Sequence, residues 1–87
     1  MNIWEAIEAA AGSRVVRLET VAVEGDVEWV VAELEDGRWA ATDDAEISPG
    51  RVSIHPTREE AIAYQRSGWI AAGGDAGGRV RWVGPDR

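Results

Sequence analysis

The fold is decided by residues 27–41, which read VEWVVAELEDGRWAA. Branched and aromatic residues on both sides of Asp36-Gly37 favour β-strands. An Asp-Gly dipeptide between two such runs is typical of a two-residue type I′ hairpin turn. A two-residue loop pairs Leu34 with Trp39 on one face of the hairpin. The sequence therefore predicts two antiparallel strands joined by a tight turn at this point.

Another strand is expected before this hairpin. Residues 14–23 are rich in β-branched side chains, and the turn signal Gly25-Asp26 separates them from the strand at 27–35. Apolar residues occupy both alternating faces of the segment 27–32, as in a strand that is covered on its second face too. Either a helix or a second subunit in a homodimer would supply that cover.

The segment before these strands, residues 2–11, is expected to be a helix. Its apolar residues recur every three or four positions, and Trp4 and Ile7 on this stripe are expected to lie in the core. Asn2 is a suitable N-cap residue, and Gly12 is a natural stop for the helix.

A short strand and a second helix are expected after the polar connection 43–50. Residues 51–54 form the strand, and the capping box Thr57-Arg58-Glu59-Glu60 starts a helix that runs from about Arg58 to Arg66. Ser67-Gly68 is expected to end it. The buried side of this helix is expected to hold Ala61, Ile62, Gln65 and Tyr64.

The last part of the chain predicts another hairpin. Residues 69–72 and 79–83 are its strands, and the glycine-rich segment 73–78 is its loop. The whole chain is then an α+β fold, an antiparallel sheet of hairpins with two helices on one face, in the order α-β-β-β-β-α-β-β.

Composition indicates one soluble domain spanning residues 1–87. Apolar residues make up 45% and charged residues 29% of the chain, a balance typical of globular proteins. No apolar run is long enough to cross a membrane, and no secretory pattern opens the chain, so we expect a cytoplasmic protein.

The residue types argue against catalysis, a metal or a cofactor. The chain has no cysteine and a single histidine, His55, with no nucleophile at a recognisable spacing. Asp43, Asp44 and Glu46 lack the spacing of an EF-hand. The glycines of 73–78 are not followed by the lysine and helix of a phosphate-binding loop. We therefore expect a protein that is not an enzyme and holds no metal and no cofactor.

Charge is distributed unevenly along the chain. The net charge is −7, and residues 19–46 alone hold ten acidic residues and one arginine. This field disfavours nucleic acid and anionic membranes as partners and favours a basic protein surface. The alternative is a solvated acidic face that keeps the protein monomeric. The residues expected to bind the partner are Glu24, Asp26, Glu28, Glu33, Glu35, Asp36, Asp43, Asp44 and Glu46.

A second candidate site lies near the C-terminus. Arg79 and Arg81 alternate with Val80 and Trp82, so one face of the last predicted strand is basic and could accept carboxylates or phosphates. The alternative is two solvated arginines that offset the acidic surface.

Small size, an acidic sheet and the lack of a catalytic set together resemble the small phage and mobile-element proteins that disarm bacterial defence, of which anti-CRISPR proteins are the best known. This resemblance implies a non-enzymatic inhibitor, encoded by a phage and acting in the host cytoplasm. It would occupy the basic, nucleic-acid-binding surface of a defence complex.

Two shorter resemblances suggest alternatives. Residues 1–12, MNIWEAIEAAAG, followed by Val15-Val16-Arg17, are similar to the opening of a phage family that sequesters the signalling nucleotides of Thoeris defence. For such a nucleotide sponge, Arg79, Arg81 and a tryptophan would grip the ligand between subunits. Residues 57–61, TREEA, resemble the helix entry of antitoxin-like small α+β domains, which implies a generic protein-interaction domain.

Overall fold

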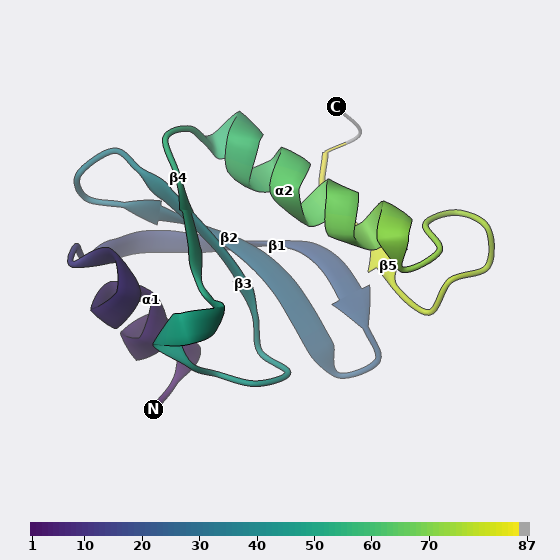
Figure 1. Ribbon diagram of the computed structural model, residues 1–87, viewed down its shortest axis with the longest axis horizontal. Coiled ribbons are helices and arrows are strands. Elements are labelled where there is room, and N and C mark those ends of the chain that lie inside the picture. Colours follow the sequence, from purple (N-terminus) through teal and green to yellow (C-terminus); the bar gives the residue numbers. More distant parts are fainter. Residues whose placement is uncertain (86–87) are drawn as a thin grey trace.

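The computed structural model describes residues 1–85, which form two α-helices, one short 3-10 helix and five β-strands (Figure 1). In chain order these elements are α1 (Ile3–Ala11), β1 (Val15–Glu24), β2 (Val27–Leu34), β3 (Trp39–Asp43), η1 (Pro49–Arg51), β4 (Ser53–His55), α2 (Arg58–Ala71) and β5 (Arg81–Trp82). The strands form a single antiparallel sheet in the order β4-β3-β2-β1-β5. The predicted α+β class with an antiparallel sheet and two helices is confirmed.

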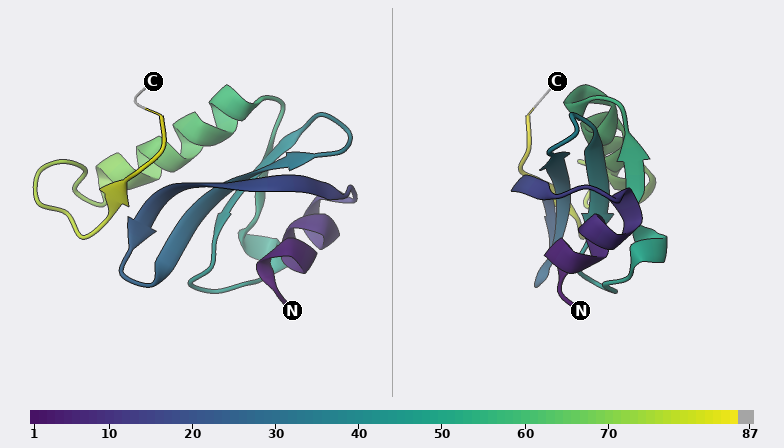
Figure 2. Two further views of the ribbon diagram at one scale, coloured as in Figure 1. Left: turned by 180° about the vertical axis from the view of Figure 1, so that it is seen from behind. Right: turned by 90° about the vertical axis from the view of Figure 1, so that its left-hand side faces the viewer.

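The two helices lie on opposite faces of the sheet, and in this respect the prediction that they share one face is corrected. Val31 belongs to the buried cluster that contains Ala61 and Ile62 of α2, whereas Ala32 belongs to the cluster that contains Ile7 of α1. Adjacent residues of a strand point to opposite faces, so each helix covers its own face. The left view of Figure 2 shows α2 above the sheet and α1 below it. The apolar second face of β2 is therefore covered by a helix of the same chain.

The β2–β3 hairpin forms where it was predicted, but its register is shifted by one residue. Trp39 lies opposite Glu33, not opposite Leu34. The loop has three residues, because the Leu34 N–H donates to the Arg38 carbonyl at 3.0 Å and closes the ladder there. Only Gly37 in this loop has a positive φ, of 92°. A type I′ turn also needs a positive φ at Asp36, which this loop avoids.

The end of α2 differs from the prediction as well. The helix continues through Gly68 to Ala71, so Trp69 is a helical residue and the predicted hairpin of 69–72 with 79–83 does not form. Trp69 is only 6% exposed, and its indole N–H donates to the Val80 carbonyl at 2.9 Å. The short β5 pairs with β1 instead, placing Trp82 opposite Ala22.

The helix starts follow the predicted caps. Asn2 Oδ1 accepts the Glu5 N–H at 2.8 Å, and the Glu5 carboxylate accepts the Asn2 N–H at 2.9 Å, which completes a capping box. Ile7 is 1% exposed and lies in the core as expected, whereas Trp4 is 39% exposed and the prediction that it is a core residue is wrong. Thr57 caps α2 through the Glu60 N–H. Neither helix described here has the length and apolar character that crossing a membrane requires.

Candidate functional site

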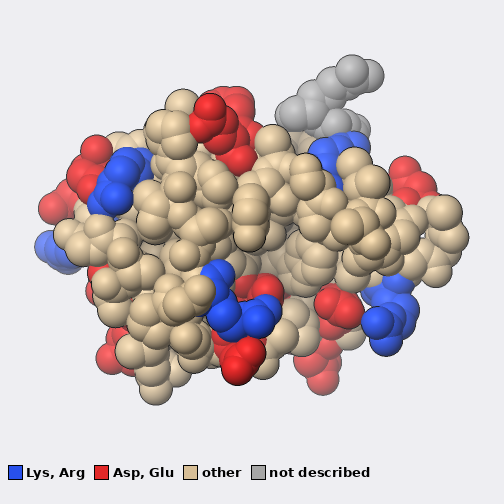
Figure 3. Space-filling view, in the orientation of Figure 1, with Lys and Arg blue, Asp and Glu red and all other residues tan. Residues whose placement is uncertain are grey.

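The nine acidic residues expected to bind a partner fall into two groups at opposite ends of β2. Consecutive turns of an antiparallel sheet lie at opposite ends of the strand they share. Three of them, Glu33, Glu35 and Asp36, lie at the β2–β3 turn. The other six form what we call the acidic end, at the β1–β2 turn and the loop after β3: Glu24, Asp26, Glu28, Asp43, Asp44 and Glu46. Figure 3 shows acidic side chains along the lower edge of the molecule, where this turn and this loop lie in Figure 1.

The carboxylates at the β2–β3 turn are largely compensated by arginines. Arg17 Nε donates to Glu33 Oε1 at 2.8 Å, and Arg38 Nε donates to Asp36 Oδ2 at 2.8 Å. The hydrogen bond from Arg38 lowers the pKa of Asp36, and the same contact raises the pKa of Arg38. Arg38 also donates to the Ala11 carbonyl at 2.6 Å, which ties this turn to the end of α1. Two of these three acids therefore have structural partners already.

Three of the six carboxylates of the acidic end accept hydrogen bonds from neutral donors. Asp44 Oδ1 accepts the Glu28 N–H at 2.8 Å, and Glu28 Oε1 accepts the Thr20 hydroxyl at 2.6 Å. Asp43 Oδ1 accepts the Ala45 N–H at 3.0 Å. Neutral donors fix the positions of these carboxylates without removing their charge. Because these carboxylates are already ordered, binding a partner costs less of their side-chain entropy than it would for mobile carboxylates.

One arginine of residues 1–85, Arg51, forms ion pairs with the acidic end. Its guanidinium donates to Asp43 Oδ2 at 3.2 Å and to Glu46 Oε2 at 3.3 Å. Both contacts are long and partly exposed, so each contributes little to stability. Only two of the six carboxylates are thus paired with an arginine of residues 1–85, and the local charge remains negative.

A groove of about 660 Å³ lies beside the acidic end, between α2 and the β3–η1 region. Its lining combines aromatic rings, a carboxylate, a guanidinium and a side-chain amide, from Trp29, Asp43, Arg51, Tyr64 and Gln65. Sequence reasoning placed Tyr64 on the buried side of α2, but the ring is 54% exposed. It placed Gln65 correctly, at 6% exposure, without assigning it a role. A glutamine at a buried helix position is the signal that could have pointed to this groove, since a buried amide needs partners.

No known protein family, curated protein or solved structure matches this chain.

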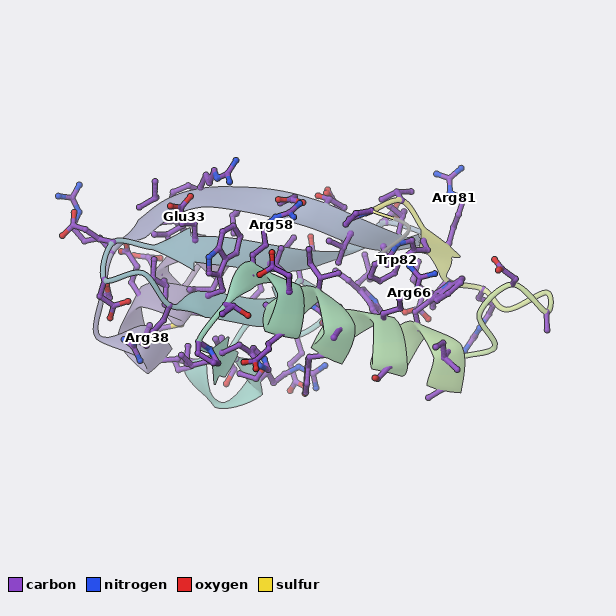
Figure 4. The ribbon with its side chains drawn as sticks, turned by 90° about the horizontal axis from the view of Figure 1, so that it is seen from above. Glu33, Arg38, Arg58, Arg66, Arg81 and Trp82 are labelled. Atoms are coloured by element: carbon purple, nitrogen blue, oxygen red, sulfur yellow. The ribbon has the colours of Figure 1, made fainter. Side chains whose placement is uncertain are left out.

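The second candidate site, at Arg79 and Arg81, is only partly assembled. Arg79 precedes β5, so Arg81 alone of the two lies on the strand, and Figure 4 shows its side chain pointing away from the ribbon. Arg66 lies next to Trp82 instead, with its guanidinium carbon 5.2 Å from the centroid of that ring (Figure 4). The Trp82 indole N–H donates to the Pro85 carbonyl at 2.8 Å. The indole N–H of Trp82 and the guanidinium of Arg66 thus already have partners within the chain.

The remaining titratable groups of residues 1–85 include His55, the single histidine of the chain. No three histidine, aspartate or glutamate side chains there converge to hold a metal ion. His55 Nε2 lies 2.8 Å from Ser53 Oγ, and the His55 ring packs against the Tyr64 ring. Burial lowers the pKa of His55, and the nearby carboxylate of Glu60 opposes this shift.

Proposed function

We propose that this protein is a non-catalytic binding protein whose acidic end occupies the basic surface of a protein partner. We take the class of partner from the resemblance to phage anti-defence proteins. The partner is then a nucleic-acid-binding complex of bacterial defence, and the protein acts as its inhibitor. A surface built to hold phosphates attracts a concentrated set of carboxylates for the same electrostatic reason.

The observation that supports this proposal is the imbalance of fixed charge at the acidic end. Of its six carboxylates, only Asp43 and Glu46 form ion pairs within residues 1–85, both with Arg51, and Glu28, Asp43 and Asp44 are oriented by backbone or hydroxyl donors. The acids of the β2–β3 turn are less suited to the role, because Glu33 and Asp36 are paired with arginines. We therefore place the partner's contact at the acidic end.

Two double variants of equal net charge test this placement. Asp26→Asn with Glu46→Gln neutralises exposed carboxylates of the acidic end, and Glu35→Gln with Glu59→Gln neutralises exposed carboxylates elsewhere. Octalysine serves as the basic probe, and calorimetry at about 0.05 M and about 0.5 M NaCl measures its affinity, which screening should weaken strongly. We expect the acidic-end variant to bind about two- to tenfold more weakly than the wild type, and the other variant to stay close to it.

Two results would contradict the proposal. Equal losses in both variants would mean that net charge alone attracts the peptide, with no defined site. An affinity independent of salt would mean that charge does not drive the interaction. Glu5 and Glu8 are unsuitable as controls, because Glu5 caps α1 and Glu8 accepts the Val15 N–H at 2.9 Å.

A further inference from the structure

We propose that the groove beside the acidic end binds an arginine side chain of the partner. This inference rests on the proposed function and deepens it, since it names the residue that the partner inserts. The groove opens on the surface next to Asp43 and Glu46, and its volume of about 660 Å³ can admit one long side chain from an apposed protein.

Two aromatic rings form the walls of this groove. Trp29 comes from β2 and is half-buried, and Tyr64 comes from α2 and is 54% exposed. Gly68 of α2 passes over the Trp29 ring so closely that a Cβ at this position would lie 3.3 Å from it. The Trp29 indole therefore packs directly against the backbone of α2. Aromatic faces of this kind attract guanidinium groups.

The inner wall presents a hydrogen-bond acceptor. Gln65 is only 6% exposed, and its side-chain nitrogen donates to the carbonyls of Val30 and Thr42, at 2.8 Å in each case. Because both neighbours are carbonyls, the nitrogen must face them and the oxygen must point away. No donor within residues 1–85 bonds to Gln65 Oε1, yet that oxygen is not sealed from solvent, so it is open to a ligand in the groove it lines.

The charge around the groove selects a cation. Asp43 and Glu46 already share the guanidinium of Arg51 at the rim, which shows that these carboxylates can accept guanidinium donors. Two carboxylates against one guanidinium leave the rim negative, and Asp44 adds to this charge. An anionic ligand is disfavoured here. A planar cation with several N–H donors can hydrogen-bond to the carboxylate and amide oxygens and also stack on the aromatic rings. Arginine fits this description better than lysine, because its fork of N–H donors is flat and less strongly hydrated.

Three other tryptophans of this protein are in contact with arginine side chains. Within residues 1–85, Arg17 lies over Trp39, and Arg66 lies over both Trp69 and Trp82, at 5.2 to 5.7 Å from the ring centroids. Among the described residues no arginine lies over Trp29 in this way, and its ring lines an open groove. An arginine of the partner would complete the same arrangement there.

The test compares two peptides of equal charge. Octalysine and the same peptide with one central arginine are titrated into the 87-residue chain, and the indole N–H signal of Trp29, assigned with Trp29→Phe, is followed by NMR. We expect the arginine peptide to bind about two- to fivefold more tightly and to shift the Trp29 signal, whereas octalysine leaves it in place. Tyr64→Ala should remove this preference while keeping the affinity for octalysine. Ile70→Ala, at a 62% exposed position of the same helix outside the groove, should keep both.

Each outcome has a distinct meaning. If both peptides bind equally and the Trp29 signal does not move, the arginine pocket is overturned and the proposed function stands. If the preference for arginine survives in Tyr64→Ala, the groove is not its source, and the inference is overturned as well. If neither peptide binds, the proposed function and the arginine pocket fail together.

Discussion

At the scale of single residues, Gly37 sets the register of the β2–β3 hairpin. Its φ of 92° is the one positive value in this loop, and its N–H donates to the Leu34 carbonyl at 3.0 Å. Register matters here because a one-residue shift moves every side chain of a strand to the other face. In the observed register, Trp39 shares a face with Glu33, and Arg17 lies over its ring at 5.7 Å.

Replacing Gly37 with alanine should destabilise the fold by about 1 kcal/mol, because an L-residue is strained at this φ. A Cβ at Gly37 would meet no atom within 4 Å, so the cost is a backbone cost and not a clash. Gly50→Ala is the matched control, since Gly50 lacks a positive φ and its Cβ would lie at an ordinary 3.6 Å from Ser48 Oγ. Urea denaturation measures both variants. A Gly37→Ala variant as stable as Gly50→Ala would contradict the observed loop.

At the scale of elements, local signals predicted the starts of both helices and the end of α1 at Gly12, but not the end of α2. Asn2 and Thr57 cap α1 and α2 as their sequences predict, because a cap involves only neighbouring residues. Ser67-Gly68 was interpreted as the end of α2, yet the helix continues. Gly68 serves packing instead, since it lets the helix approach Trp29 of β2. That contact joins residues far apart in the chain, and no local pattern reveals it.

The candidate site shows the same division between local and long-range information. Composition located the acidic residues correctly in the chain, but it could not separate the six at the acidic end from the three at the β2–β3 turn. Which of them are compensated depends on contacts such as that of Glu33 with Arg17 across two strands. The lining of the groove could not be predicted as a set, because Trp29, Arg51 and Gln65 come from three different elements.

Helix α1 should contribute strongly to stability through its cover of the second face of the sheet. Ile7→Ala removes a 1% exposed side chain that packs in the cluster with Ala32 and Ala40, and we expect a loss of about 2 to 5 kcal/mol. Ile70→Ala makes the same chemical change at a 62% exposed position of α2 and should cost little. Thermal and urea unfolding compare the two. Equal effects would mean that α1 is not part of the cooperative core.

At the scale of the whole molecule, little sheet surface is left for a second copy. Helix α1 covers one face and α2 covers the other, so the cover that a homodimer could have supplied comes from the chain itself. The edge strands β4 and β5 have only three and two residues, and Pro56 directly follows β4. The short β4 edge, followed by a proline, is a poor template for pairing with another chain, whereas β5 pairs only with Ala22 and Val23 and leaves the rest of the β1 edge open. The charge of −7 also opposes self-association, by repulsion.

These two causes of a monomeric state can be separated by salt. The Debye length falls from about 8 Å at 0.15 M to about 3 Å at 1 M ionic strength, so high salt removes most of the repulsion and leaves the covered faces unchanged. We expect sedimentation to show a single-chain mass at both salt concentrations, because helices of the same chain cover both faces of the sheet. Dimerisation that appears only at 1 M salt would show that charge alone keeps the molecules apart. In that case an exposed apolar surface remains, and Ile70→Ala would test whether it lies on the outer side of α2.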